Sequence, residues 1–83
     1  PNPFNPSTQI SYALSEEAMV KISIYDMVGR KVRTLVNKTQ SPGYYTTRWN
    51  ATSDYGYSLS AGVYIYTINA GTYKKMKKMV VLK

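Results

Sequence analysis

The sequence predicts an all-β domain, a small immunoglobulin-like antiparallel β-sandwich of six to seven strands. Apolar and polar residues alternate with a period of two, and no window keeps the 3.6-residue period of a helix for three turns. Turn-forming residues separate the alternating segments at hairpin spacing, for example at residues 26–29 and 42–43. Short strands joined by such turns are typical of two-sheet sandwiches.

In the first half of the chain, apolar side chains at every second position predict two strands, over residues 9–14 and 19–25. Residues 26–29 then form a turn, because an Asp can cap its own backbone and a following Gly tolerates positive φ. A third strand is expected over residues 31–36 and a turn over residues 37–43. The apolar faces of the first two strands consist of Ile10, Tyr12, Leu14, Val20, Ile22 and Ile24.

In the second half, a fourth strand is expected over residues 44–49, with the face that carries Trp49 buried. Residues 51–61 are rich in Ser, Asp and Gly and predict a long loop, with a short edge strand near residues 57–59. Two further strands follow, over residues 63–69 and about 73–82. The expected core consists of Tyr12, Ile22, Ile24, Trp49, Tyr64, Tyr66 and Ile68.

The segment before the fifth strand favours the immunoglobulin-like alternative among small β folds. Leu59 and a Gly precede Tyr64, as in a tyrosine corner, where the ring is buried and its hydroxyl bonds to nearby backbone. An ordinary half-buried tyrosine fits the same residues. A barrel of the oligonucleotide-binding type also fits, since it too consists of short antiparallel strands.

At 83 residues the chain is expected to be a single domain, 1–83, whose core is thin. Residues 1–7 contain three prolines and predict an extended, linker-like lead-in, because proline lacks a backbone donor. Together with the strand expected at the other end, this lead-in suggests a module cut from the C-terminal end of a larger protein. The chain contains no cysteine, which excludes a disulfide framework.

The charge balance favours anionic partners. Eleven Lys and Arg against four Asp and Glu give a net charge of +7. Nucleic acid, acidic polysaccharide and bacterial surface headgroups would all suit it. Four of the positive charges lie within residues 74–78, where lysines on an edge strand would also deter aggregation.

The last residues combine these lysines with an apolar run. Because Met79, Val80, Val81 and Leu82 are consecutive, a strand that contains them must place apolar side chains on both faces. One face is then available to a neighbouring loop, a parent domain or a partner. Such a partner could add a strand to the sheet edge.

Several motifs, in the same order and spacing, resemble the C-terminal sorting domain of type IX secretion substrates, type A. A related immunoglobulin-like domain of the flagellar hook-capping protein shares the middle motifs but not the tail. The matching segments are Pro1-Asn2-Pro3-Phe4-Asn5-Pro6-Ser7-Thr8, Ile10-Ser11-Tyr12-Ala13-Leu14, Ile24-Tyr25-Asp26-Met27-Val28-Gly29-Arg30, Trp49-Asn50, Gly62-Val63-Tyr64-Ile65-Tyr66 and Lys78-Met79-Val80-Val81-Leu82-Lys83.

The resemblance implies a module that directs a larger exported protein through the periplasm and across the outer membrane, to be secreted or held at the cell surface. Its expected partners are the outer-membrane secretion machinery and a sortase-like enzyme, with an anionic surface polysaccharide as a further candidate. The residues expected to carry the sorting signal are Lys77, Lys78, Met79, Val80, Val81, Leu82 and Lys83.

Catalysis is not expected, because the chain lacks histidine and cysteine and has only four carboxylates, Glu16, Glu17, Asp26 and Asp54. No cofactor or metal is expected either. Asp54 with Asn50, Thr52 and Ser53 could offer oxygens to calcium, but one carboxylate without the regular loop spacing is a weak signal.

Nine tyrosines keep a second function open, an accessory carbohydrate-binding or structural module of a secreted glycosidase. The rings that turns or outward faces could present to sugars are Tyr44, Tyr55, Tyr57 and Tyr73. Tyrosine also suits a half-buried sheet surface, which is the more ordinary role. Nucleic-acid binding is not expected, since the chain has one basic strand but no aromatic stacking motif. Stable membrane insertion is not expected either, because no apolar stretch is long enough to span a membrane.

Overall fold

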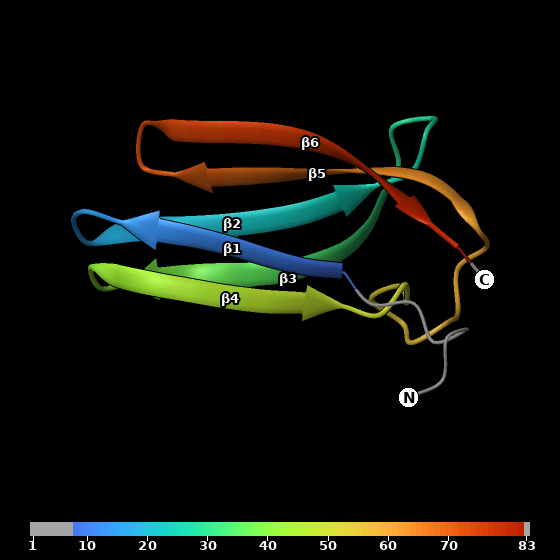
Figure 1. Cartoon of the computed structure of the whole chain (residues 1–83), viewed down its shortest axis with the longest axis horizontal. Coiled ribbons are helices and arrows are strands. Elements are labelled where there is room, and N and C mark those ends of the chain that lie inside the picture. Colours follow the sequence, from blue (N-terminus) through green and yellow to red (C-terminus); the bar gives the residue numbers. More distant parts are fainter. Residues whose placement is uncertain (1–7, 83) are drawn as a thin grey trace.

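In a computed structural model, the described residues 8–82 form six strands and no helix, so the all-β prediction is confirmed. The predicted lead-in over residues 1–7 and Lys83 lie outside the described residues. The strands in Figure 1 are β1 (Thr8–Leu14), β2 (Ala18–Tyr25), β3 (Lys31–Gln40), β4 (Gly43–Trp49), β5 (Gly62–Ala70) and β6 (Tyr73–Val81).

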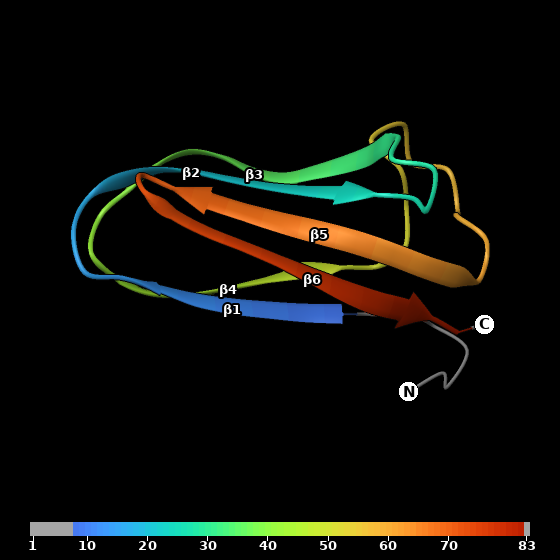
Figure 2. The ribbon, with the colours of Figure 1, turned by 90° about the horizontal axis from the view of Figure 1, so that it is seen from above.

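The strands form two antiparallel sheets that lie in separate layers (Figure 2). One sheet pairs β1 with β4, and the other has the order β3-β2-β5-β6. In the lettering of immunoglobulin domains, β1 and β4 correspond to strands B and E, and β3-β2-β5-β6 corresponds to the facing sheet C′-C-F-G. The predicted immunoglobulin-like sandwich is therefore correct, with six strands within residues 8–82, and the barrel alternative does not apply.

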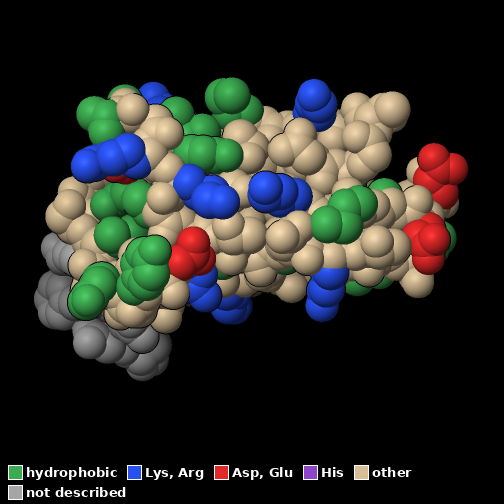
Figure 3. All heavy atoms as spheres, turned by 180° about the vertical axis from the view of Figure 1, so that it is seen from behind, with side chains coloured by type: hydrophobic (Ala, Val, Ile, Leu, Met, Phe, Trp, Pro, Cys, Tyr) green, Lys and Arg blue, Asp and Glu red, His purple; other side chains and the backbone are tan. Residues whose placement is uncertain are grey.

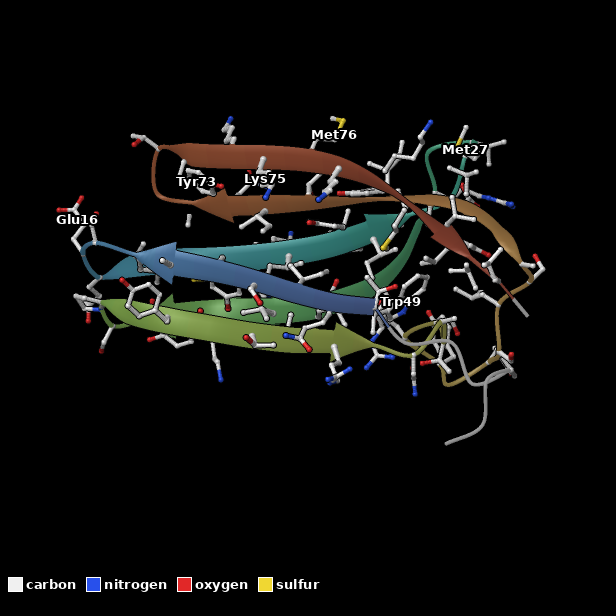
Figure 4. The ribbon with its side chains drawn as sticks, viewed as in Figure 1. Glu16, Met27, Trp49, Tyr73, Lys75 and Met76 are labelled. Carbon is white, nitrogen blue, oxygen red and sulfur yellow. The ribbon has the colours of Figure 1, made fainter. Side chains whose placement is uncertain are left out.

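The core lies between the two layers and consists mainly of apolar side chains that occupy every second position of the strands. Figure 4 marks Trp49, which packs edge-on against Tyr64 of the opposite sheet with ring centroids 5.3 Å apart. Each large apolar side chain contributes about 1.5–3 kcal/mol when fully buried. The buried apolar residues are Ile10, Val20, Ile22, Ile24, Trp49, Ala51, Tyr64, Tyr66, Ile68, Ala70 and Val81.

Tyr12, predicted in the core, is only partly buried, and it joins the two layers at their rim. Its ring stacks on Tyr45 at 5.4 Å, and its hydroxyl donates to Gln40 Oε1 in the opposite sheet at 2.8 Å. Burial raises the pKa of the Tyr12 hydroxyl above its ordinary value, and the bond to Gln40 opposes this shift.

The turn predicted over residues 37–43 is wrong. β3 continues to Gln40, where it pairs with Ala18, and the turn occupies residues 41–42 only. An edge strand can be extended by polar residues, because its backbone pairs with β2 while its side chains face solvent. The strand predicted near residues 57–59 is reduced to one bridge, between Thr52 and Ser58.

Ser23 lies on the face of β2 opposite to the one that carries Ile22 and Ile24, yet it is buried. It lies in β2, which has β3 on one side and β5 on the other, opposite Thr34 and Thr67. Flanking strands cover a short side chain at the centre of a sheet even on the solvent face. Alternation predicts the face of a residue but not how much its neighbours cover it.

Candidate functional site

The C-terminal segment forms an edge of the four-stranded sheet. β6 pairs with β5 on one side only, so the other side of its backbone has no strand partner within residues 8–82. An unpaired edge can accept a further strand, because its N–H and C=O groups are free to bond. Figure 4 labels Tyr73, Lys75 and Met76 along this strand.

The apolar end of β6 is divided between the two faces, as predicted. Met79 packs against the core, and Val81 is 3% exposed and pairs with Gly62 of β5. Val80 and Leu82 are 57% and 76% exposed. The last residues therefore hold the strand in the fold with one face and present apolar side chains to solvent with the other.

The lysines of β6 lie on both faces of the strand. Lys77 pairs with Tyr66 and Lys75 with Ile68, and both partners are core residues, so these two lysines project from the core-side face. Lys74 and Lys78 project from the other. All four are exposed, and none makes an ion pair within residues 8–82. Inward-pointing charges are a recognised protection against edge-to-edge aggregation, and here they also leave an electropositive edge.

Within residues 8–82, none of the four carboxylates makes an ion pair with a lysine of β6, although the β1–β2 loop lies near the start of this strand. Asp26 pairs with Arg30 at 2.9 Å, and Asp54 lies 3.6 Å from Arg33. Glu16, labelled in Figure 4, and the adjacent Glu17 occupy the β1–β2 loop. The predicted site residues Lys77 to Leu82 thus lie together along the free edge of the sheet, with Val81 buried and Val80 and Leu82 exposed, and Lys83 lies outside the described residues.

Tyr64, at the start of β5, has the geometry of a tyrosine corner. Its side chain is 6% exposed, and its hydroxyl donates to the Ser60 carbonyl oxygen at 2.7 Å. Leu59 packs against the same core, and its N–H donates to the Ala51 carbonyl oxygen. The contact connects the 51–61 loop to the strand that pairs with β6.

A second tyrosine repeats this arrangement, and the sequence interpretation missed it. Tyr45, at the start of β4, donates its hydroxyl to the Ser41 carbonyl oxygen at 2.6 Å, again four residues upstream. A Ser-X-Gly-X-Tyr segment leads into each strand, and its two glycines, Gly43 and Gly62, have φ of 152° and 153°. L side chains rarely adopt such values. This internal repeat is the sequence signal from which the arrangement at Tyr45 could have been predicted.

The 50–54 segment is organised by protein donors. The Thr52 hydroxyl bonds Asn50 Oδ1 at 2.6 Å and lies 2.9 Å from Arg33 Nη1. Asp54 Oδ1 accepts the Thr34 N–H at 2.9 Å. A guanidinium beside these oxygens disfavours a bound cation, which weakens the calcium alternative. Residues 8–82 contain no group of three acidic side chains that could hold a metal.

Asp26 caps the β2–β3 turn, as its sequence position predicted. Its Oδ1 accepts the N–H groups of Val28 and Arg30, and its Oδ2 accepts Arg30 Nε–H. The Arg30 N–H bond, followed by the Arg30 side chain and the Val28 N–H, lowers the pKa of the Asp26 carboxyl. This carboxylate stabilises a turn.

The four tyrosines predicted to be accessible are all exposed, but they are divided between the ends of the sandwich. Tyr44 and Tyr73 follow the β3–β4 and β5–β6 turns at one end, whereas Tyr55 and Tyr57 belong to the loop at the other (Figure 1). They form no common platform for a sugar chain.

A family model described as a secretion system C-terminal sorting domain matches residues 1–82. A comparison with curated proteins finds no match. In the part of the chain that the structure describes, no helix has the length and apolar character needed to cross a membrane.

Proposed function

Because the chain belongs to the family of secretion system C-terminal sorting domains, which carry the sorting signal for type IX secretion, we propose that its signal is concentrated in residues 77–83. The observation that carries this proposal is the exposure of Val80 and Leu82 at the end of an edge strand whose other face is anchored in the core. The rest of the sandwich serves to hold this segment extended and accessible.

The mode of recognition that fits this geometry is addition of a strand to β6. Main-chain hydrogen bonds to the free edge would supply affinity, and pockets for Val80 and Leu82 would supply specificity. Four exposed lysines at residues 74–78 would select a partner with acidic residues and would speed its approach. The partner in this proposal is a component of the type IX secretion machinery.

On this proposal, the module directs a larger exported protein from the periplasm across the outer membrane to the cell surface or the medium. It acts without catalysis. A sortase-like enzyme and an anionic surface polysaccharide are the further partners that the resemblance implies.

The test uses a periplasmic reporter fused to the module in a host with a type IX system, with reporter measured at the cell surface and in the periplasm. Val80→Ser combined with Leu82→Ser should retain the reporter in the periplasm, because the exposed apolar side chains are lost while Val81 stays in the core. Val28→Ser is the matched control, since Val28 is also exposed but lies in the β2–β3 turn.

Charge is tested separately with Lys77→Gln combined with Lys78→Gln, against Lys21→Gln combined with Lys38→Gln in β2 and β3. Surface changes of this kind usually alter stability by no more than about 0.5 kcal/mol. A loss of secretion in such a variant can therefore be distinguished from a loss of folding. The denaturant midpoint of each variant is measured beside secretion. Normal export of the folded Val80/Leu82 variant would show that the signal lies elsewhere in the module.

A further inference from the structure

A hollow of about 500 Å³ lies at the loop end of the sandwich, away from the unpaired edge of β6. Tyr55, Tyr57 and Leu59 of the 51–61 loop line it on one side, and Arg30 and Lys31 line it from the β2–β3 turn and the start of β3. Figure 3 shows hydrophobic and basic side chains side by side at this end of the molecule, on the left in that view.

The two tyrosines are among the most exposed large side chains of the described chain, at 86% and 72%. Neither ring stacks on another within residues 8–82. The Ser53 hydroxyl oxygen accepts the N–H groups of both residues, each at 3.2 Å. Their backbones are thus ordered while their rings remain free, an arrangement typical of aromatic contact residues in binding loops.

The loop beneath these rings is tied to β3 by several polar contacts. The Asp54 N–H donates to the Val32 carbonyl oxygen, and the Thr34 N–H donates back to Asp54 Oδ1, both at 2.9 Å. Within the loop itself, the Ser53 N–H donates to the Tyr57 carbonyl oxygen at 2.9 Å. A loop held in this way loses little conformational freedom when a ligand binds.

Two cations, Arg30 and Lys31, and two carboxylates, Asp26 and Asp54, line the hollow, and Arg33 next to Asp54 brings the local balance to one positive charge. Asp26 is paired with Arg30, and Asp54 accepts the Thr34 N–H and faces Arg33. Lys31 is exposed and makes no ion pair within residues 8–82. A ligand that enters the hollow therefore meets satisfied carboxylates, an unpaired ammonium and two free aromatic faces.

We propose that this hollow binds an acidic saccharide, with sugar rings stacked on Tyr55 and Tyr57 and a sugar carboxylate or phosphate next to Lys31. The flat apolar faces of the phenol rings match the axial C–H faces of pyranose rings, and the phenol hydroxyls can bond sugar hydroxyls. The neighbouring cation favours acidic over neutral sugars. The β6 edge takes no part in this site.

The test titrates the 83-residue chain with a galacturonic acid hexasaccharide and, in parallel, with neutral maltohexaose. Nuclear magnetic resonance should show backbone shifts concentrated in residues 53–59 and 30–31 with the acidic probe, and at least about tenfold weaker binding of the neutral one. Tyr55→Ala combined with Tyr57→Ala should weaken binding of the acidic probe about tenfold. Tyr44→Ala, which removes an even more exposed ring elsewhere, should leave it unchanged.

Non-specific attraction to a cationic protein is tested with single-charge variants of equal net charge. Lys31→Gln should weaken binding severalfold, whereas Lys38→Gln and Lys75→Gln should not. Equal losses in all three variants, shifts centred on β6, or affinity that is indifferent to both loop tyrosines would each overturn the proposal. Equal affinity for maltohexaose would do so as well. Sorting of the Tyr55/Tyr57 variant should remain normal, so this site and the tail are separable.

Discussion

Trp49 of β4 and Tyr64 of β5 meet edge to face across the two sheets, with ring centroids 5.3 Å apart and an interplanar angle of 70°. Both rings are anchored to the loop between their strands. Trp49 Nε1–H donates to the Thr52 carbonyl oxygen and the Tyr64 hydroxyl to that of Ser60. The pair therefore closes the core at the loop end and fixes both ends of the 51–61 segment.

Trp49→Ala should lower the free energy of unfolding by roughly 3–5 kcal/mol, because it removes the largest core side chain and leaves a cavity. This is a large share of the stability of a small domain. A denaturant titration followed by tyrosine fluorescence measures the effect. Arg48→Ala, on the exposed face of the same strand, is the control, and an equal loss in both variants would contradict the core assignment.

Tyr64→Phe should cost about 0.5–1.5 kcal/mol of stability, because the Ser60 carbonyl oxygen loses its donor while the ring stays in the core. Tyr45→Phe removes the equivalent bond at the half-buried start of β4 and should cost less, since water can replace the hydroxyl there. Urea midpoints of the two variants give the comparison. A larger loss in Tyr45→Phe would refute this ranking.

Gly62→Ala should destabilise the domain by about 1–3 kcal/mol, because φ of 153° is strained for any residue with a Cβ. No atom lies within 4 Å of the Cβ position, so the cost arises from the backbone and not from a clash. Gly43→Ala, with the same φ, should behave alike. Thermal unfolding of both variants tests the pair, and an unchanged midpoint in either would argue against the repeat.

Asp26 should make stability fall at acidic pH. Its pKa is lower in the folded chain than the ordinary value of 3.8, so its contribution is complete above about pH 5 and is lost as pH falls through the folded pKa. Asp26→Asn should flatten this part of the stability profile, measured by urea unfolding between about pH 5 and pH 2. Glu17→Gln supplies a matched charge change in an exposed loop. Identical profiles for wild type and Asp26→Asn would exclude the role.

Local pattern was sufficient for most strands because each strand has one face in the core. Val20, Ile22 and Ile24 alternate with more polar residues, and all three are fully buried. The same reasoning failed at residues 37–40, where polar side chains on an edge strand give no apolar signal. Their strand conformation depends on pairing with β2, a partner distant in sequence.

The two proposed binding surfaces could also be predicted only in part from the sequence. The sequence alone predicted that residues 79–82 must expose apolar side chains on one face, because consecutive apolar residues in a strand cannot all point inward. It could not predict that Val81 is the buried member and Leu82 the exposed one, since that depends on the register of β6 against β5. Nor could it place Lys31 beside Tyr55 in one hollow. Side chains more than twenty residues apart come together only when the two sheets pack, and this long-range packing is the property that a local pattern does not contain.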